Sequence, residues 1–157
     1  RKGDLQNLCV AVVGDIRHSR VARSTGTALQ TLGVGELRFV SPASLAPEAD
    51  EFPGAKRCTS LEDGIRGADV IMALRIQKER MDQSQIPDVD AFLKEWGITE
   101  RSILHANKGA IVLHPGPMNR GVEIESAVAD GKQAVILNQV TFGIAVRMAV
   151  MSIVAGN

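Results

Sequence analysis

The feature of the sequence that most constrains the fold is a series of short apolar runs separated by segments with helical periodicity. The clearest run is "LCVAVVGD" at residues 8–15, which stays apolar until it ends in Gly-Asp. Such a run is typical of a strand that is buried on both faces of a parallel sheet. Four further runs predict strands: "ELRFVSP" at 36–42, "ADVIMAL" at 68–74, "AIVLHPGP" at 110–117 and "AVILNQV" at 134–140.

Helices are predicted between and after these strands, at residues 20–33, 60–68, 89–97 and 143–156. Ser60 is a suitable N-cap for the second helix, with Asp63 three residues on, and Gly33 and Gly97 suit the ends of the first and third. Strands that alternate with helices predict a three-layer α/β fold. We therefore expect one domain over residues 1–157, with about five mainly parallel strands and helices on both faces.

Composition excludes several function classes. The 18 Lys and Arg residues balance the 18 Asp and Glu residues, so no broad field for nucleic acid or a membrane surface is expected. Apolar residues make up 45% of the chain but never run unbroken for the length of a membrane span. Cys9 and Cys58 form neither a disulfide framework nor a metal-ligand spacing. These features predict a cytoplasmic globular protein with no metal and no cofactor.

Three polar segments follow predicted strands and are therefore expected at one edge of the sheet. They are "GDIRHSRVARS" at 14–24, "RIQKERM" at 75–81 and "HPGPMNRGVEI" at 114–124. Open parallel sheets bind ligands at this carboxyl edge. The segments are therefore the candidates for a binding site, with a solvated turn as the alternative for each.

The second segment holds residue types that suit a carboxylate. Arg75 stands directly at a strand end, where its guanidinium can take a carboxylate bidentately, and Gln77 shares its side if the chain stays extended. Glu79 is expected to partner one of the nearby cations. The loop from 76 to 87 has few apolar anchors and is expected to be mobile without ligand.

The third segment holds two prolines around one glycine, so its backbone is stiff and presents carbonyl acceptors. His114 fits either a buried structural histidine or a catalytic base. Arg120 and Glu123 fit either a surface pair or site residues.

Four ordered stretches resemble the aspartate carbamoyltransferase catalytic chain: "VVGDIRHSRVARS", "ALRIQKERM", "VLHPGPMNRGVEI" and "LNQVTFGIAVRMAV". The resemblance covers essentially all of residues 1–157, and only the second half of that family, the aspartate-binding domain. The carbamoyl phosphate domain, with its Ser-Thr-Arg-Thr loop, has no counterpart in this sequence. It is therefore expected in the same protein or in another chain, and residues 1–157 alone are expected to be inactive.

The resemblance implies roles for individual residues. Arg20 and Arg75 match the arginines that hold the aspartate carboxylates, and Gln77 matches a further substrate contact. Gly116 and Pro117 match the backbone that meets carbamoyl phosphate, and their peptide bond is a candidate for the cis form. The implied reaction transfers a carbamoyl group to the amine of L-aspartate, in pyrimidine biosynthesis, within a homotrimer. It requires no covalent enzyme nucleophile.

Three alternatives remain. An ornithine carbamoyltransferase shares the fold but binds an amine side chain, so an acid or thiol is expected near its proline loop. Here "HPGP" replaces the Cys-Leu-Pro of that family, and Arg75 suits an anionic substrate. A nucleotide-dependent dehydrogenase domain lacks support because the glycine fingerprint is missing. The third alternative is a non-catalytic binding or assembly domain.

Overall fold

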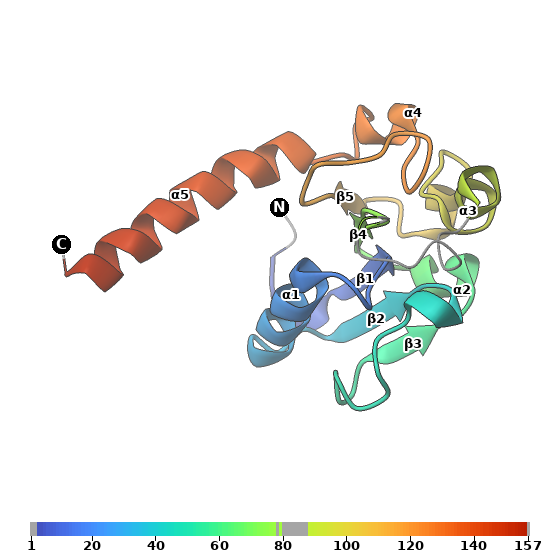
Figure 1. Cartoon of the computed structure of the whole chain (residues 1–157). Coiled ribbons are helices and arrows are strands. Elements are labelled where there is room, and N and C mark those ends of the chain that lie inside the picture. Colours follow the sequence, from blue (N-terminus) through green and yellow to red (C-terminus); the bar gives the residue numbers. More distant parts are fainter. Residues whose placement is uncertain (1–2, 78, 80–87, 157) are drawn as a thin grey trace.

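Five parallel strands form one sheet in the computed structural model, which describes residues 3–77, 79 and 88–156 (Figure 1). The strand order is β3-β2-β1-β4-β5, and every neighbouring pair is parallel. The predicted α/β class is confirmed. The strands are β1 (Cys9–Gly14), β2 (Glu36–Val40), β3 (Lys56–Cys58), β4 (Val70–Leu74) and β5 (Ile111–Leu113).

Helices cover both faces of this sheet, with α1 on one side and α2 and α3 on the other (Figure 1). Side-chain caps begin three of them: Ser19 accepts from Ala22 N at 3.1 Å, and Ser60 and Asp88 cap α2 and α3 in the same way. The α-helices are α1 (Arg20–Thr31), α2 (Leu61–Ile65), α3 (Val89–Trp96), α4 (Ser126–Ala129) and α5 (Ile136–Ala155). Short 3₁₀ turns lie at Leu5–Asn7, Ala43–Leu45 and Ser102–His105.

Strand β1 is the centre of the core, and every residue of it is buried. Its alternate side chains point to opposite faces. Val10 and Val12 belong to the cluster that includes Ala22 of α1, whereas Ala11 and Val13 belong to the cluster under α2 and α3. Two covered faces explain why residues 8–15 are apolar without alternation.

Two strand predictions differ from the structure. The run 134–140 is not a strand, because α5 begins at Ile136 and only Ala134 forms an isolated bridge, to Val112. The fifth strand is instead β3, whose Lys56 and Arg57 are exposed. An apolar run of seven residues fits a strand or a helix equally well, and a short polar edge strand carries no apolar signal. The predicted mobile loop falls mostly on residues 78 and 80–87, outside the described part of the chain.

A charged network joins the edge of the sheet to helix α2. Glu36 Oε1 and Oε2 accept from Arg38 Nε and Nη2 at 3.0 Å each, and Lys56 Nζ lies 2.5 Å from Oε1. Arg38 Nη1 donates to the carbonyls of Gly64 and Arg66 at the end of α2, at 3.1 and 2.8 Å. The hydrogen bonds that Glu36 accepts from Arg38 and Lys56 lower the pKa of its carboxyl group to about 2. In the same region, burial raises the pKa of the Cys9 thiol to about 11, which keeps it protonated.

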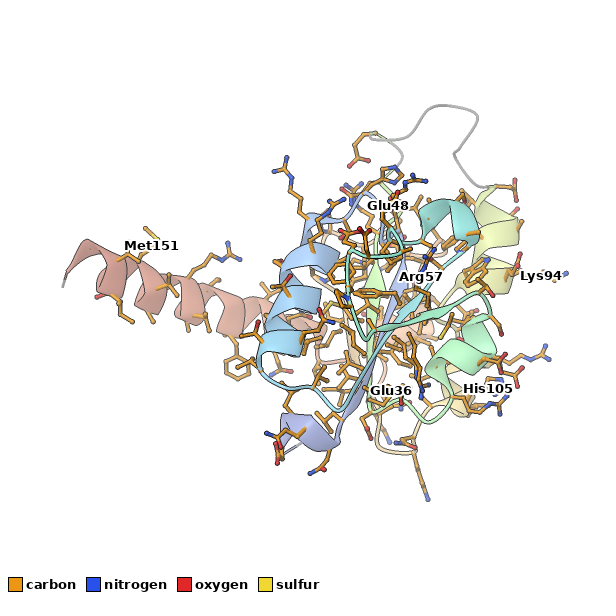
Figure 2. The ribbon with its side chains drawn as sticks, turned by 90° about the horizontal axis from the view of Figure 1, so that it is seen from below. Glu36, Glu48, Arg57, Lys94, His105 and Met151 are labelled. Atoms are coloured by element: carbon orange, nitrogen blue, oxygen red, sulfur yellow. The ribbon has the colours of Figure 1, made fainter. Side chains whose placement is uncertain are left out.

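Helix α5 has a different environment, because it leaves the sheet and extends away from the other elements (Figure 1). Met151 therefore lies far from the sheet (Figure 2). The large exposed apolar residues of α5 are Leu137, Val140, Phe142, Ile144, Val146, Met148, Val150, Met151, Ile153 and Val154. By length and composition α5 is apolar enough to cross a membrane, with a mean hydropathy of 1.5. One such helix is weak support for a span, because helices of soluble proteins pass the same test.

The lowered pKa of Glu36 predicts a dependence of stability on pH. A carboxyl group whose folded pKa lies below its ordinary value of 4.5 stabilises the fold above that pH. The contribution is lost as pH falls from about 4.5 to about 2, and it is at most about 3 kcal/mol because solvent reaches the side chain. In urea unfolding over this range, the wild type should lose more stability than Glu36→Gln. Equal slopes for the two proteins would contradict the assignment.

The exposed face of α5 predicts self-association of the 157-residue chain, since large apolar patches favour contact between molecules. Met151→Lys combined with Val154→Lys places two charges on this face and should shift the chain toward the monomer in sedimentation velocity. Leu32→Lys, at a single exposed apolar residue after α1, is the matched control and should leave the distribution unchanged. A monomeric wild type would contradict the prediction.

Candidate functional site

The candidate site lies at the carboxyl edge of the sheet, where the direction of strand addition reverses. The chain first adds β2 and β3 on one side of β1, then adds β4 and β5 on its other side. The ends of β1 and β4 are therefore neighbours, with Gly14 in register with Leu74. In open α/β sheets this reversal creates the crevice that binds ligands.

Asp15 links the ends of β1 and β4 by hydrogen bonds. Its side chain is fully buried and accepts from His18 N at 3.1 Å and from His18 Nδ1 at 2.9 Å. Its other oxygen accepts from Gln77 N at 3.4 Å, and Gln77 Nε2 donates to His18 O at 3.1 Å. The sequence interpretation did not select Asp15, although a carboxylate directly after a buried strand was a signal that could have found it.

Gly14 allows the two strands to approach at this point. Its φ is 122°, a region that L side chains rarely adopt, and an added Cβ would lie 2.5 Å from the Leu74 carbonyl oxygen. The crevice floor thus depends on a residue without a side chain.

Arg75 stands at the end of β4, as predicted, and is half-buried. Its Nη1 donates to Glu79 Oε2 at 3.2 Å, and its Nη2 contacts the other Glu79 oxygen, so Glu79 partners Arg75. The hydrogen bonds to Glu79 raise the pKa of the Arg75 guanidinium, and the charges of Glu79 and Glu123 act in the same direction. The guanidinium is therefore held in one orientation beside the crevice.

Arginines of the first polar segment divide into two groups. Arg17 pairs with Glu48 and Arg23 with Glu51, each at 2.9 Å, so both belong to solvated surface pairs. Arg20 is the first residue of α1 and is exposed at the same sheet edge. Within the described residues, the structure records no ion pair for Arg20.

The proline loop, residues 114–119, follows β5, and buried side chains hold it by hydrogen bonds. His114 is fully buried, its Nδ1 accepts from Gly116 N at 2.9 Å, and its Nε2 lies 3.2 Å from Glu123 Oε1. The Gly116–Pro117 peptide bond is cis, as the family resemblance implied. Arg120 instead pairs with Asp130 at 2.7 and 2.8 Å, away from Glu123, so these two residues are not partners.

The structure thus brings Arg75, Gln77 and the Asp15 side chain to one strand junction, with the proline loop at the end of the adjacent strand β5. Gln77 uses its side-chain amide to bind His18 O in this structure. Among residues 3–77, 79 and 88–156, no group of three or more His, Cys, Asp or Glu side chains has the geometry for a metal ion. The chemistry that this arrangement supports is the binding and orientation of a small charged molecule.

Comparison with known proteins agrees with a domain of this class. The family model of the aspartate/ornithine carbamoyltransferase Asp/Orn binding domain matches residues 6–154. The match covers almost the whole chain, and the protein therefore belongs to this family of carbamoyltransferase domains.

Solved ornithine carbamoyltransferases share the fold. The enzyme of Burkholderia thailandensis E264 is 22% identical with a TM-score of 0.77, over 96% of this chain and 48% of that chain. The enzyme of Pyrococcus furiosus is 21% identical with a TM-score of 0.79, over 96% of this chain and 50% of that chain. The enzyme of Gloeobacter violaceus is 24% identical with a TM-score of 0.71, over 87% and 47%. The chain thus spans about half the length of these enzymes.

Gly14→Ala tests the strand junction. The substitution meets both an unfavourable φ and the Leu74 carbonyl, so we expect a loss of roughly 2–4 kcal/mol in the free energy of unfolding. Gly143→Ala, in α5, is the control: an added Cβ there meets nothing closer than 3.8 Å, and alanine favours helix. Urea unfolding measures both, and a Gly14→Ala protein as stable as the wild type would contradict the role of the close approach.

Proposed function

We propose that residues 1–157 form the aspartate-binding domain of an aspartate carbamoyltransferase. The observation that carries the proposal is the oriented Arg75 guanidinium at the β1–β4 junction, with exposed Arg20 at the same edge. L-aspartate has two carboxylates, and an arginine fork suits each of them. A second domain, in the same protein or in another chain, would supply the carbamoyl phosphate site.

In this proposal the domain works by holding and aiming the amino acid. Arg20 and Arg75 bind the two carboxylates, Gln77 adds a contact, and the Gly116–Pro117 backbone faces carbamoyl phosphate. The amine nitrogen bonds to the carbamoyl carbon, the bond from that carbon to the phosphate oxygen breaks, phosphate leaves and the amine loses a proton. Orientation and electrostatic stabilisation supply the rate, without a covalent intermediate.

Arg75 is suited to this role because Glu79 holds it in place. A guanidinium has five N–H donors, and the Glu79 contacts use two of them. A side chain that is already ordered loses less rotamer entropy when it binds a ligand. Glu79 therefore supports binding by Arg75 and leaves donors for a substrate carboxylate.

Transfer to ornithine is the second candidate, and two observations favour it. The solved relatives described above are all ornithine carbamoyltransferases. In addition, Glu123 places a buried carboxylate behind the proline loop, where an amine-binding site would need an acid. Against it, that carboxylate is shielded from solvent, and "HPGP" stands where Cys-Leu-Pro is expected. The sequence identities between this chain and those solved ornithine enzymes are below 25%, so they support the shared fold and do not decide the substrate.

We infer that the whole protein acts in the cytoplasm as a homo-oligomer, a trimer by resemblance, in pyrimidine biosynthesis. The support is the family of the domain, its balanced charge and its two free cysteines. In such an assembly the apolar face of α5 has protein to cover it.

The discriminating experiment is a substrate comparison with the whole protein. Labelled carbamoyl phosphate is offered with L-aspartate or with L-ornithine, and the two carbamoylated products are separated. We expect transfer to aspartate with a kcat/KM at least about 100-fold above that for ornithine, because a mismatched charge leaves buried groups unpaired. The reverse preference would establish the ornithine alternative, and transfer to neither would favour a binding or assembly domain.

Arg75→Ala tests the carboxylate clamp in the whole protein. Loss of a charge-assisted fork should cost roughly 2–5 kcal/mol, or about 30-fold or more in kcat/KM for aspartate. Arg75→Lys should recover little, since an ammonium cannot reproduce the fork. Circular dichroism and urea unfolding verify the fold.

Arg66→Ala is the matched control, because exposed Arg66, directly after α2, also pairs with an exposed Glu four residues away. It should leave kcat/KM within about twofold, as expected for a surface pair. Equal effects of Arg66→Ala and Arg75→Ala would show that Arg75 has no special role.

A further inference from the structure

Glu123 is a buried carboxylate whose two oxygens have different environments. The side chain is 2% exposed, and its Oε1 is 2.5 Å from Asn119 N and 3.2 Å from His114 Nε2. Its Oε2 is also buried and has no hydrogen-bond partner among the described residues. A buried carboxylate oxygen without a partner destabilises a fold. An apolar side chain would avoid that cost but would leave the Asn119 and His114 donors without this acceptor, so the acid serves to hold these two groups.

The hydrogen bonds around His114 define the positions of its protons. Gly116 N–H donates to His114 Nδ1, so Nδ1 carries a lone pair and no proton. The proton of the neutral ring is then on Nε2, which donates to Glu123 Oε1. Glu123 thereby selects the His114 tautomer that can accept from Gly116. In general, a carboxylate that accepts a hydrogen bond from one imidazole nitrogen leaves the other nitrogen free to act as an acceptor.

One carboxylate therefore holds the proline loop on both sides of Pro117. Through His114 it fixes Gly116 before the proline, and directly it fixes Asn119 after it. His114 N also donates to Gln139 Oε1 of α5 at 3.1 Å, which anchors the beginning of the loop. Pro115 and Pro117 have no N–H to donate, so the loop is held through the N–H groups of His114, Gly116 and Asn119.

We propose that Glu123 and His114 are positioning residues for the reaction, which hold the Gly116–Pro117 backbone so that its carbonyls face the reacting amine and carbamoyl group. The inference rests on the proposed carbamoyl transfer and deepens it. Neither residue touches the substrate, because both are buried behind the loop. The charge of Glu123 also helps to raise the pKa of the Arg75 guanidinium, after the larger effect of Glu79.

Paired substitutions in the whole enzyme separate positioning from folding. Glu123→Leu and His114→Leu remove the hydrogen bonds and should lower kcat by about 100-fold, because small misplacements at a reacting centre have effects of this size. Glu123→Gln keeps an acceptor oxygen, and His114→Asn keeps an acceptor for Gly116 N–H. Both conservative variants should stay within about tenfold of the wild type. The KM for the amino acid should change far less than kcat in all four proteins.

Glu125→Leu is the control, because Glu125 also accepts a backbone N–H, from Glu100 at 2.9 Å, but lies outside the proline loop. It should leave kcat within about twofold. A kcat of Glu123→Leu equal to that of Glu125→Leu would overturn the proposal. So would equal losses in Glu123→Gln and Glu123→Leu, since a charge and not the hydrogen bonds would then be responsible.

A spectroscopic measurement tests the same inference without activity. Nitrogen NMR of the protein labelled at histidine should show an unprotonated Nδ1 and a protonated Nε2 for His114, with the signal assigned by its absence in His114→Asn. Glu123→Gln should preserve this tautomer, so the inference stays testable if the leucine variants do not fold. A protonated Nδ1 would overturn the positioning role. An enzyme that carbamoylates neither amino acid would overturn the proposed function, while the tautomer would still decide how Gly116 is held.

Discussion

The buried Asp15 carboxylate is the interaction on which the site depends. It lies at the one place where the sheet reverses its direction of strand addition, and it accepts hydrogen bonds from both flanking segments. Without such an acceptor, the backbone N–H groups of His18 and Gln77 would lack these bonds beside a hydrophobic core. The bonds define where β1 and β4 end, and therefore the direction in which Arg75 leaves the sheet. Gly14 contributes to the same junction by allowing the strands to approach.

The domain is neutral overall, so any attraction for a ligand has to be local. Arg17, Arg23 and Arg120 have partners on the surface, where a pair contributes little. Arg75 differs because it is half-buried and lies at the strand junction. Its hydrogen bonds to Glu79 are exposed, so its place at the strand end is what distinguishes it from the surface arginines. Position in the fold therefore distinguishes Arg75, the proposed binding residue, from surface arginines of the same residue type.

Sequence patterns predicted those parts of the molecule that local physics determines. The doubly buried β1, the capped helices α1, α2 and α3, and the stiff proline loop follow from apolar periodicity, capping residues and proline geometry. The polar edge strand β3 was missed because it buries too little to need apolar residues. Residues 134–140 were misassigned because the apolar start of α5 looks the same as a buried strand. Asp15 was missed because tertiary structure supplies one of its partners: Gln77 is 62 positions from Asp15. Glu123 was considered as a partner of Arg120 or as a site residue, but local patterns did not predict its actual partners, His114 and Asn119.

Two buried acids thus support the carboxyl edge in complementary ways. Asp15 uses both oxygens to close the floor between β1 and β4, which explains its burial without further function. Glu123 uses one oxygen to hold the loop after β5 and leaves the other without a partner among the described residues. In the proposed reaction, an amine and a carbonyl group must meet within a fraction of an ångström, which requires rigid support on both sides. The floor at Asp15 supports the side that carries Arg75, and the Glu123–His114 pair supports the side that carries Gly116 and Pro117. The unequal satisfaction of the two acids therefore identifies the proline loop as the part of the site where stability has been given up for position.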